Sequence, residues 1–270
     1  MRNIFIKTIL LFLIICFPVY GAVDFDGTDD LINMGDIPAL DDSTSVSCFA
    51  WVWNDNLTQD HHIFGQKFQA AGNDSGIDWK EDDVGSASAR TNTYTIFIEE
   101  TAGAGDSTTV IEGATNAAQA NVWQSVAFTA TTGSSTGLHL YINGAEDANS
   151  PASTSALGNL GGDNSDFTAG TDPDGDGARN GRIGEIACWS SVLTASEILN
   201  IHNAKIKRYM LQVQPSNLQG YWSLDDVSEG LSGDGATFRD LTSNNNDGVG
   251  DNGANNSGLT GLAEQILTYP

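Results

Sequence analysis

The stretch GRIGEIACWSSVLTASEILNIHN, Gly181 to Asn203, decides the fold. In its first half, Ile183 and Trp189 alternate with Ile186 and Cys188, so apolar side chains fall on both faces of an extended chain. This pattern predicts a strand that is covered on both faces. Thr194 then opens T-A-S-E, so its hydroxyl can cap the amide of Glu197 while the Glu197 carboxylate reaches back to the Thr194 amide. We therefore expect a short amphipathic helix directly after the strand, with basic residues in its last turns.

The N-terminal residues predict a secretory signal peptide. Two basic residues, Arg2 and Lys7, precede an apolar run, Ile9 to Phe17, which is too short to span a bilayer. Small residues near Gly21 then match a cleavage site. Cys16 leaves a lipoprotein open as the alternative, although the large side chain before it departs from the usual lipobox. We expect residues 1–21 to be removed and the mature chain to be secreted, extracellular or held at the cell surface.

Acidic residues dominate the charge of the chain. The 270 residues include 35 Asp and Glu against 11 Lys and Arg, for a formal net charge of −24. A field of this sign repels phosphates, so nucleic acid and anionic membrane surfaces are poor partners, and cations are good ones. Solubility in salty water explains the same charge without any specific use. The sequence also predicts no membrane span.

Three further stretches carry strand patterns. AVDFDGTDDLINMG, Ala22 to Gly35, predicts two strands around a turn at Asp26-Gly27-Thr28, and VSCFAWVWN, Val46 to Asn54, predicts a third. NVWQSVAFTATTGSSTGLHLYINGAEDA, Asn121 to Ala148, predicts a hairpin and then a type I′ turn at Asn143-Gly144. In this order, and followed by the strand and helix quoted above, the motifs resemble the laminin-G-like and pentraxin-like jelly rolls of the concanavalin A-like superfamily. The resemblance implies an all-β antiparallel sandwich with one short α-helix toward its C-terminal side.

The resemblance places the sandwich in residues 22–214 and leaves residues 215–270 as a C-terminal segment. GYWSLDD, Gly220 to Asp226, is similar to a strand that usually precedes the F-D-G strand in this family. Two interpretations are open: the segment completes the sandwich, or it begins a truncated second repeat. Completion is favoured, because an orphan strand that carries Tyr221 and Trp222 would expose an aggregation-prone edge.

Cys48 and Cys188 are the cysteines that remain after the leader, and both lie on predicted strands of an exported chain. The family pattern sets these two strands close together. The resemblance therefore implies a Cys48–Cys188 disulfide, and the alternative is a pair of buried thiols.

Three sets of oxygen-bearing residues are candidate Ca²⁺ ligands. The stretch D-P-D-G-D-G places carboxylates at every second position with glycines for the turn, as hard cations require. The resemblance implies two other sets, one in pentraxin-like loops and one between the F-D-G turn and the closing strand. Acidic solvated turns without an ion are the alternative for each set. The candidates are Asp172, Asp174 and Asp176 in the first set; Asn73, Asp74, Asp163, Asn164 and Asp166 in the second; and Asp26, Gly27, Asp30 and Glu185 in the third.

Trp79 and Tyr94 lie near loops rich in Asp and Ser, and we expect them to be exposed stacking surfaces for a ligand.

The sequence signals for catalysis are weak. Gly133 to Gly137 matches G-x-S-x-G, but it links two hairpin strands where a nucleophile elbow joins a strand to a helix. The E-x-D-x-x-E pattern of glycosidases with this fold does not occur, and His61-His62 would point to opposite faces of a strand.

We interpret the chain as a secreted, non-catalytic binding module. The resemblance implies that its partner is an extracellular carbohydrate or glycoconjugate, with Ca²⁺ as stabiliser or bridge. One alternative is a structural or adhesive surface protein that binds other proteins. A second alternative is a divergent polysaccharide hydrolase or lyase.

Overall fold

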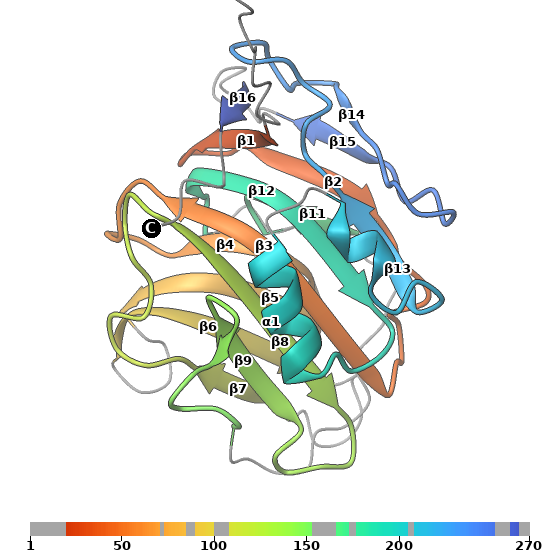
Figure 1. The fold of residues 1–270 in the computed structure, drawn as a ribbon. Coiled ribbons are helices and arrows are strands. Elements are labelled where there is room, and N and C mark those ends of the chain that lie inside the picture. Colours follow the sequence, from red (N-terminus) through yellow and green to blue (C-terminus); the bar gives the residue numbers. More distant parts are fainter. Residues whose placement is uncertain are drawn as a thin grey trace, which may run out of the picture.

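The computed structural model describes residues 20–70, 73–84, 90–99, 108–152, 166–172, 177–204, 208–251 and 260–264. In these residues, two antiparallel sheets face each other as a sandwich, with one α-helix outside (Figure 1). The predicted fold class is therefore confirmed. Residues 1–19 of the predicted leader lie outside the described residues, and in the described part no helix has the length and apolar character needed to cross a membrane.

The first sheet, sheet A, has β12 near its centre. Along its length β12 pairs with β3 on one side, and with β1 and then β13 on the other. The strands of sheet A, in spatial order, are β10 (Ala145–Glu146), β9 (Leu138–Ile142), β8 (Trp123–Thr131), β3 (Ser45–Asn54), β12 (Asn180–Trp189), β1 (Tyr20–Asp26) and β16 (Thr260–Glu264), with β13 (Leu218–Trp222) beside β12.

The second sheet, sheet B, packs against the inner face of sheet A. Its strands, in spatial order, are β14 (Thr237–Phe238), β15 (Gly248–Asp251), β2 (Leu31–Gly35), β11 (Phe167–Ala169), β4 (His61–Ala70), β5 (Asn73–Val84), β6 (Thr91–Glu99) and β7 (Thr108–Glu112). Residues 215–270 thus contribute β13 and β16 to sheet A, and β14 and β15 to sheet B.

The core between the sheets contains Trp79 and Tyr94, both with 0% of their surface exposed. Trp79 meets Phe128 of sheet A edge to face, with ring centroids 5.4 Å apart. The prediction that Trp79 and Tyr94 are exposed stacking surfaces is therefore wrong. Polar loops flank their strands, but side chains alternate along β5 and β6, and this alternation turns both rings inward.

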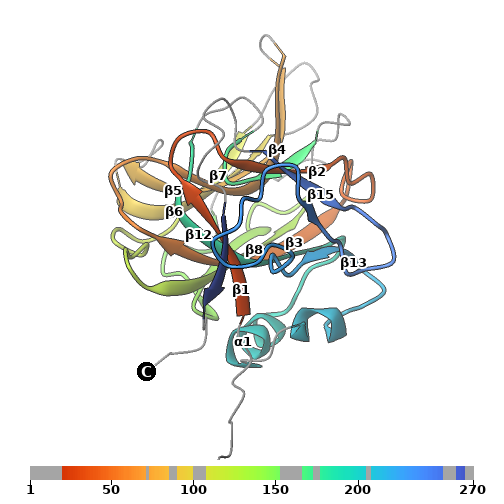
Figure 2. The same cartoon turned by 90° about the horizontal axis from the view of Figure 1, so that it is seen from above.

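The helix α1 (Ala195–Ala204) lies on the outer face of sheet A, followed by the 3₁₀ helix η1 (Tyr209–Gln212) (Figure 2). Ile198 and Ile201 of α1 belong to a second apolar cluster with Phe49 and Trp51 of β3. The predicted capping box is present: the Thr194 amide donates to Glu197 Oε2 at 2.8 Å, and the Glu197 amide donates to Thr194 Oγ1 at 3.2 Å.

The predicted disulfide is also confirmed. Cys48 and Cys188 are direct cross-strand partners on β3 and β12, with Cα atoms 4.2 Å apart, and they are joined as a disulfide. The two cysteines are 140 residues apart in sequence, so the bond closes about half of the 270-residue chain into a loop.

We expect the disulfide to contribute about 4 to 5 kcal/mol to the free energy of unfolding, because a crosslink over 140 residues removes much of the entropy of the unfolded chain. Urea unfolding of the double variant Cys48→Ala/Cys188→Ala, compared with the non-reduced protein, measures this difference. The wild-type protein unfolded with reductant present is the control and should approach the variant. A double variant as stable as the oxidised protein would contradict the prediction.

Candidate functional site

The outer face of β3 carries three aromatic side chains, Phe49, Trp51 and Trp53. The short helix α1 covers the first two, and its His202 stacks on Trp51 with ring centroids 5.4 Å apart. Trp53 lies beyond this cover and is half-buried, whereas the other tryptophans of the chain are buried. The helix therefore leaves one indole accessible at the end of β3.

Trp53 belongs to a row of side chains that crosses four neighbouring strands of sheet A. Trp123 on β8 is its direct partner in the register, Arg182 on β12 is its partner on the other side, and Asp24 on β1 is opposite Arg182. We call Trp123, Trp53, Arg182 and Asp24 the tryptophan–arginine row. The side chains of Arg182 and Asp24 are 21% and 34% exposed, so the row is open to solvent from Trp53 to Asp24, whereas Trp123 is buried.

Contacts within the row and with Asp55 hold Trp53 in one orientation. The Arg182 guanidinium lies 5.1 Å from the centroid of the Trp53 ring, and Arg182 Nε donates to Asp24 Oδ1 at 3.2 Å. The Trp53 indole N–H donates to Asp55 Oδ1 at 2.8 Å, and Trp123 meets the ring edge to face at 6.0 Å. An indole beside fixed guanidinium and carboxylate groups offers an apolar surface and hydrogen-bonding partners to a hydroxylated ligand.

The buried guanidinium of Arg179 supports this end of sheet A from the inside. Arg179 Nη2 donates to the Trp53 carbonyl at 3.0 Å and to Asn54 Oδ1 at 2.8 Å, and Arg179 Nε donates to the Arg182 carbonyl at 3.3 Å. Asn54 continues the network to the Tyr94 hydroxyl, which donates to Gln124 Oε1 at 2.9 Å. Tyr94 is thus part of the support beneath the row.

Burial sets the electrostatics of this network. Burial lowers the pKa of Arg179 to about 10, although Tyr94, Glu81 and Asp55 raise it, so the guanidinium stays charged at neutral pH. Burial, and then the nearby Arg179 charge, lower the pKa of His61 to about 3, so that imidazole is neutral. His61 faces Glu81 inside the sandwich and His62 faces Asp78 on the other face of β4, as predicted for adjacent strand residues.

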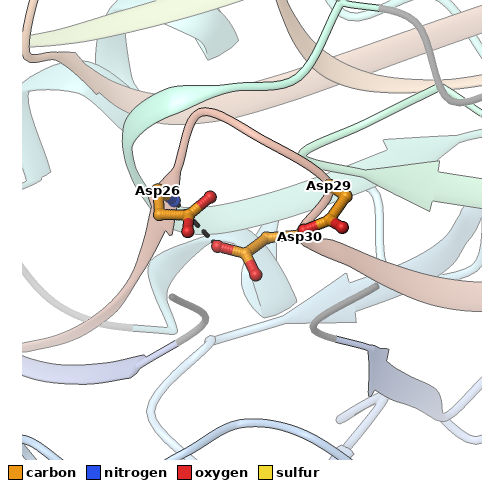
Figure 3. Close-up of side chains that lie close together, drawn as sticks. All are labelled: Asp26, Asp29 and Asp30. Atoms are coloured by element: carbon orange, nitrogen blue, oxygen red, sulfur yellow. Dashed lines mark hydrogen bonds between the residues drawn. The ribbon is translucent and has the colours of Figure 1, made fainter. Parts of the chain in front are cut away.

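A group of three carboxylates lies at the turn between β1 and β2. Asp26, Asp29 and Asp30 each offer an oxygen, and these oxygens all lie within 4.8 Å of one another (Figure 3). Hydrogen bonds define the turn: the Asp26 amide donates to Asp30 Oδ2 at 2.7 Å, and the Thr28 amide donates to Asp26 Oδ1 at 2.9 Å. Closely spaced carboxylate oxygens on a fixed backbone match the ligands that hard divalent cations take.

The acidic turn packs against the loop between β11 and β12. Gly27 has a φ of +84°, and a Cβ at this position would lie 2.8 Å from the Cβ of Asn180. The Thr171 hydroxyl donates to the Asp30 carbonyl at 2.7 Å. The structure thus brings the F-D-G turn against Thr171, the residue that directly precedes the D-P-D-G-D-G stretch. Asp172 is buried, and Asp174 and Asp176 lie outside the described residues.

Glu185 is not part of the acidic turn. Its carboxylate accepts a hydrogen bond from the Tyr221 hydroxyl and one from the Arg208 amide at 3.3 Å, under η1 on the outer face of sheet A. Burial, with the nearby Glu185 charge, raises the pKa of Tyr221, so this hydroxyl keeps its proton.

The pentraxin-like candidate set is only partly described. The exposed Asp166 accepts a hydrogen bond from Asn33 Nδ2 at 2.8 Å. Asn73 and Asp74 are in β5, in register with Ala70 and Gln69 of β4. Asp163 and Asn164 lie outside the described residues, so this set stays a prediction.

Sequence reasoning missed Asp29, Trp53, Arg182 and Arg179. Asp29 lies in the F-D-G-T-D-D run, directly before Asp30, so this run of acidic residues could have identified Asp29 as a candidate ligand. Trp53 continues the alternation of Phe49 and Trp51, and only the ten-residue length of α1 shows that the third aromatic stays uncovered.

The chain belongs to the concanavalin A-like lectin/glucanases superfamily, whose laminin-G-type family model matches residues 26–199. The resemblance seen in the sequence motifs is therefore confirmed. No curated protein matches the chain significantly.

Several solved structures are similar to this chain. A Bacteroides ovatus structure described as a candidate carbohydrate-binding protein is 18% identical, with a TM-score of 0.56, and the match covers 92% of this chain and 61% of that one. This chain thus spans less than two thirds of that protein. Domain 4 of an extracellular Geobacillus stearothermophilus arabinanase, solved with arabinotriose, is 20% identical (TM-score 0.48, covering 67% of this chain and 76% of that one). A heptameric pentraxin from Limulus polyphemus is 13% identical (TM-score 0.46, covering 70% and 84%).

We expect Arg179→Lys to lower the free energy of unfolding by about 3 kcal/mol, because an ammonium cannot reach the carbonyls of Trp53 and Arg182 and the Asn54 amide together. Urea unfolding measures the change. Arg239→Lys is the matched control, since the Arg239 side chain is 65% exposed and pairs with Asp226 at the surface. Equal, small losses in both variants would show that the buried network does not stabilise the fold.

Proposed function

We propose that this chain is a secreted, non-catalytic carbohydrate-binding module and that the tryptophan–arginine row is its sugar-contact surface. The observation that carries the proposal is Trp53, a half-buried indole at the uncovered end of sheet A, fixed by Arg182 and Asp55. A sugar ring stacks on such an apolar surface through its C–H groups, and its hydroxyls pair with the neighbouring charged groups. Membership of a superfamily that includes lectins and the description of the Bacteroides ovatus relative support the same role.

We propose Ca²⁺ as the cofactor of the module, held by Asp26, Asp29 and Asp30. The donor set supports this assignment: three carboxylates converge, and the group lies on a glycine turn held against Asn180. A bound Ca²⁺ would relieve the repulsion among these carboxylates and brace the turn. Asp26 pairs in register with Asn180, two residues along β1 from Asp24 of the row, so the ion would stabilise the border of the proposed sugar surface.

A binding role without catalysis is supported by the burial of the Glu81–His61 pair. Glu81 and His61 are fully buried between the sheets, out of reach of a polymeric substrate. Gly133 to Gly137, the G-x-S-x-G match, connects β8 and β9 as a hairpin loop, without the strand-to-helix corner that a nucleophile elbow requires. The apolar leader and the Cys48–Cys188 disulfide support the proposed secretion to an oxidising space.

We expect Trp53→Ala to weaken glycan binding at least about tenfold, which corresponds to about 1.4 kcal/mol, because the variant removes the stacking surface. A glycan array identifies the ligand, and isothermal titration with that ligand measures the affinity. Phe97→Ala is the matched control, since Phe97 is also half-buried but lies on sheet B. An array without a single bound glycan would refute the proposed function, and loss of binding in Phe97→Ala alone would move the site to sheet B.

We expect Ca²⁺ at about 100 times its dissociation constant to raise the melting temperature by about 5 to 10 °C, since ligand linkage then contributes about 2.7 kcal/mol. Asp29→Asn should remove most of this rise, whereas Glu229→Gln, which changes an exposed carboxylate outside the Asp26–Asp29–Asp30 group, should keep it. Thermal melts with Ca²⁺ and with a chelator make the comparison. An unchanged rise in Asp29→Asn would assign the ion to another site.

A further inference from the structure

A groove of about 360 Å³ lies in the C-terminal segment, away from the tryptophan–arginine row. Leu211 and Pro215 line it from the side of η1, Leu218 and Gln219 from β13, and residues 242–244 from the loop between β14 and β15. β13 pairs with the far end of β12, where Leu218 is opposite Trp189. The groove is therefore about 20 Å along β12 from Arg182, given the rise of a strand.

The loop that forms one wall is held rigidly by a buried carboxylate. Asp240 is 7% exposed, and its Oδ1 accepts hydrogen bonds from the Tyr221 and Thr242 amides at 3.1 and 2.9 Å. Its Oδ2 accepts from the Thr242 hydroxyl at 2.8 Å and from the Asn246 amide at 3.0 Å. Asn244 Nδ2 then ties the loop to β13 through the Gln219 carbonyl at 2.9 Å. A wall fixed in this way loses little conformational entropy when a ligand binds.

The opposite wall is fixed as well. The Trp189 indole N–H donates to the Val213 carbonyl at 2.8 Å, and the Asn217 amide donates to the Gln214 carbonyl at 2.9 Å. Gln219 Nε2 donates to Ser190 Oγ at 2.8 Å, which sets the orientation of this side chain. The groove is thus largely formed before any ligand arrives, as small-molecule sites usually are.

The chemistry of the lining selects for an uncharged, hydroxylated ligand. Leu211, Leu218 and Pro215 supply apolar surface, and the Ser243 hydroxyl and the side-chain carbonyl oxygens of Gln219 and Asn244 supply hydrogen-bonding groups. None of the lining residues is charged, in a chain with 35 acidic residues and a net charge of −24. An anionic ligand would meet no compensating cation there, and a cationic ligand would meet no carboxylate in the lining. Apolar patches alternating with neutral hydrogen-bonding groups suit the faces and edges of sugar rings.

We propose that this groove binds a short neutral oligosaccharide and is a second carbohydrate site. Its volume is at the lower end of the range for small-molecule sites, about 300 to 1,000 Å³, so it accommodates only a few sugar rings. The groove shares no residue with the tryptophan–arginine row or the acidic turn, so this proposal stands on its own lining. With two sites at the two ends of β12, one module would engage a polysaccharide at two points and gain avidity.

The test is a nuclear magnetic resonance titration of the ¹⁵N-labelled full-length mature chain with maltohexaose, cellohexaose, laminarihexaose and xylohexaose, each added separately. The side-chain amides of Gln219 and Asn244 report on the groove, and the Trp53 indole N–H reports on the row. We expect at least one hexaose to shift the groove amides in a saturable manner. Trp53→Ala should leave these shifts in place.

Ser243→Trp fills the groove from an exposed position and should lower the association constant at the groove amides at least tenfold. Ser216→Trp, from the opposite wall, should act in the same way, and the two variants together guard against local misfolding of either. Gln212→Trp is the matched control, because Gln212 is exposed on η1 and does not line the groove. Melting temperatures of all three variants verify that they fold.

Three results would overturn the proposal. Shifts at Trp53 without shifts at Gln219 and Asn244 would refute the groove and leave the proposed function intact. Shifts at the groove amides that persist unchanged in both Ser243→Trp and Ser216→Trp would show that the ligand binds elsewhere. If none of the four hexaoses shifted the groove amides, the groove proposal would also be refuted. The proposed function of the tryptophan–arginine row is tested separately by the wider glycan array.

Discussion

The guanidinium of Arg179 is the interaction on which the proposed sugar surface depends. Burying a cation between two sheets costs free energy unless hydrogen bonds replace its water. Arg179 bonds through Nε and Nη2 with the carbonyls of Trp53 and Arg182 and with the Asn54 side chain, so it recovers part of that cost and fixes the backbone of both strands. The same two residues meet on the outer face, where the Arg182 guanidinium lies over the Trp53 ring. The position of the row is thus set from both sides of sheet A.

The fold could be predicted from local patterns because each strong motif has a local physical cause. The alternation from Ile183 to Trp189 and the capping box at Thr194 and Glu197 need only the neighbouring residues to be understood, and the structure contains both. The Cys48–Cys188 bond was implied by the family pattern and follows from the pairing of β3 with β12. The strand pairings of the C-terminal segment depend on contacts across the whole chain, and the sequence left two alternatives there.

The candidate site was only partly predictable, because exposure is decided by tertiary cover. Trp79 and Trp53 both occur in alternating strands, yet one faces sheet A in the core and the other lies beyond the end of α1. Asp26 and Asp30 could be singled out from the F-D-G turn, whereas Glu185 was assigned by its place in the closing strand and is bonded to Tyr221 under η1. Which carboxylates converge depends on how strands stack, and this information is not local.

The order of strands in sheet A has a consequence for biosynthesis. β1 is the first of the described strands, yet its two neighbours, β12 and β16, come from Asn180–Trp189 and Thr260–Glu264. The ribosome synthesises β1 long before either neighbour. The backbone amides and carbonyls of β1 therefore have no strand partners until β12 and then β16 have been synthesised. Sheet A can therefore be completed at β1, the strand that bears Asp24 and the start of the acidic turn, only after Thr260–Glu264 has been synthesised. A nascent fragment that lacks the C-terminal strands would present β1 as an unpaired, aggregation-prone edge.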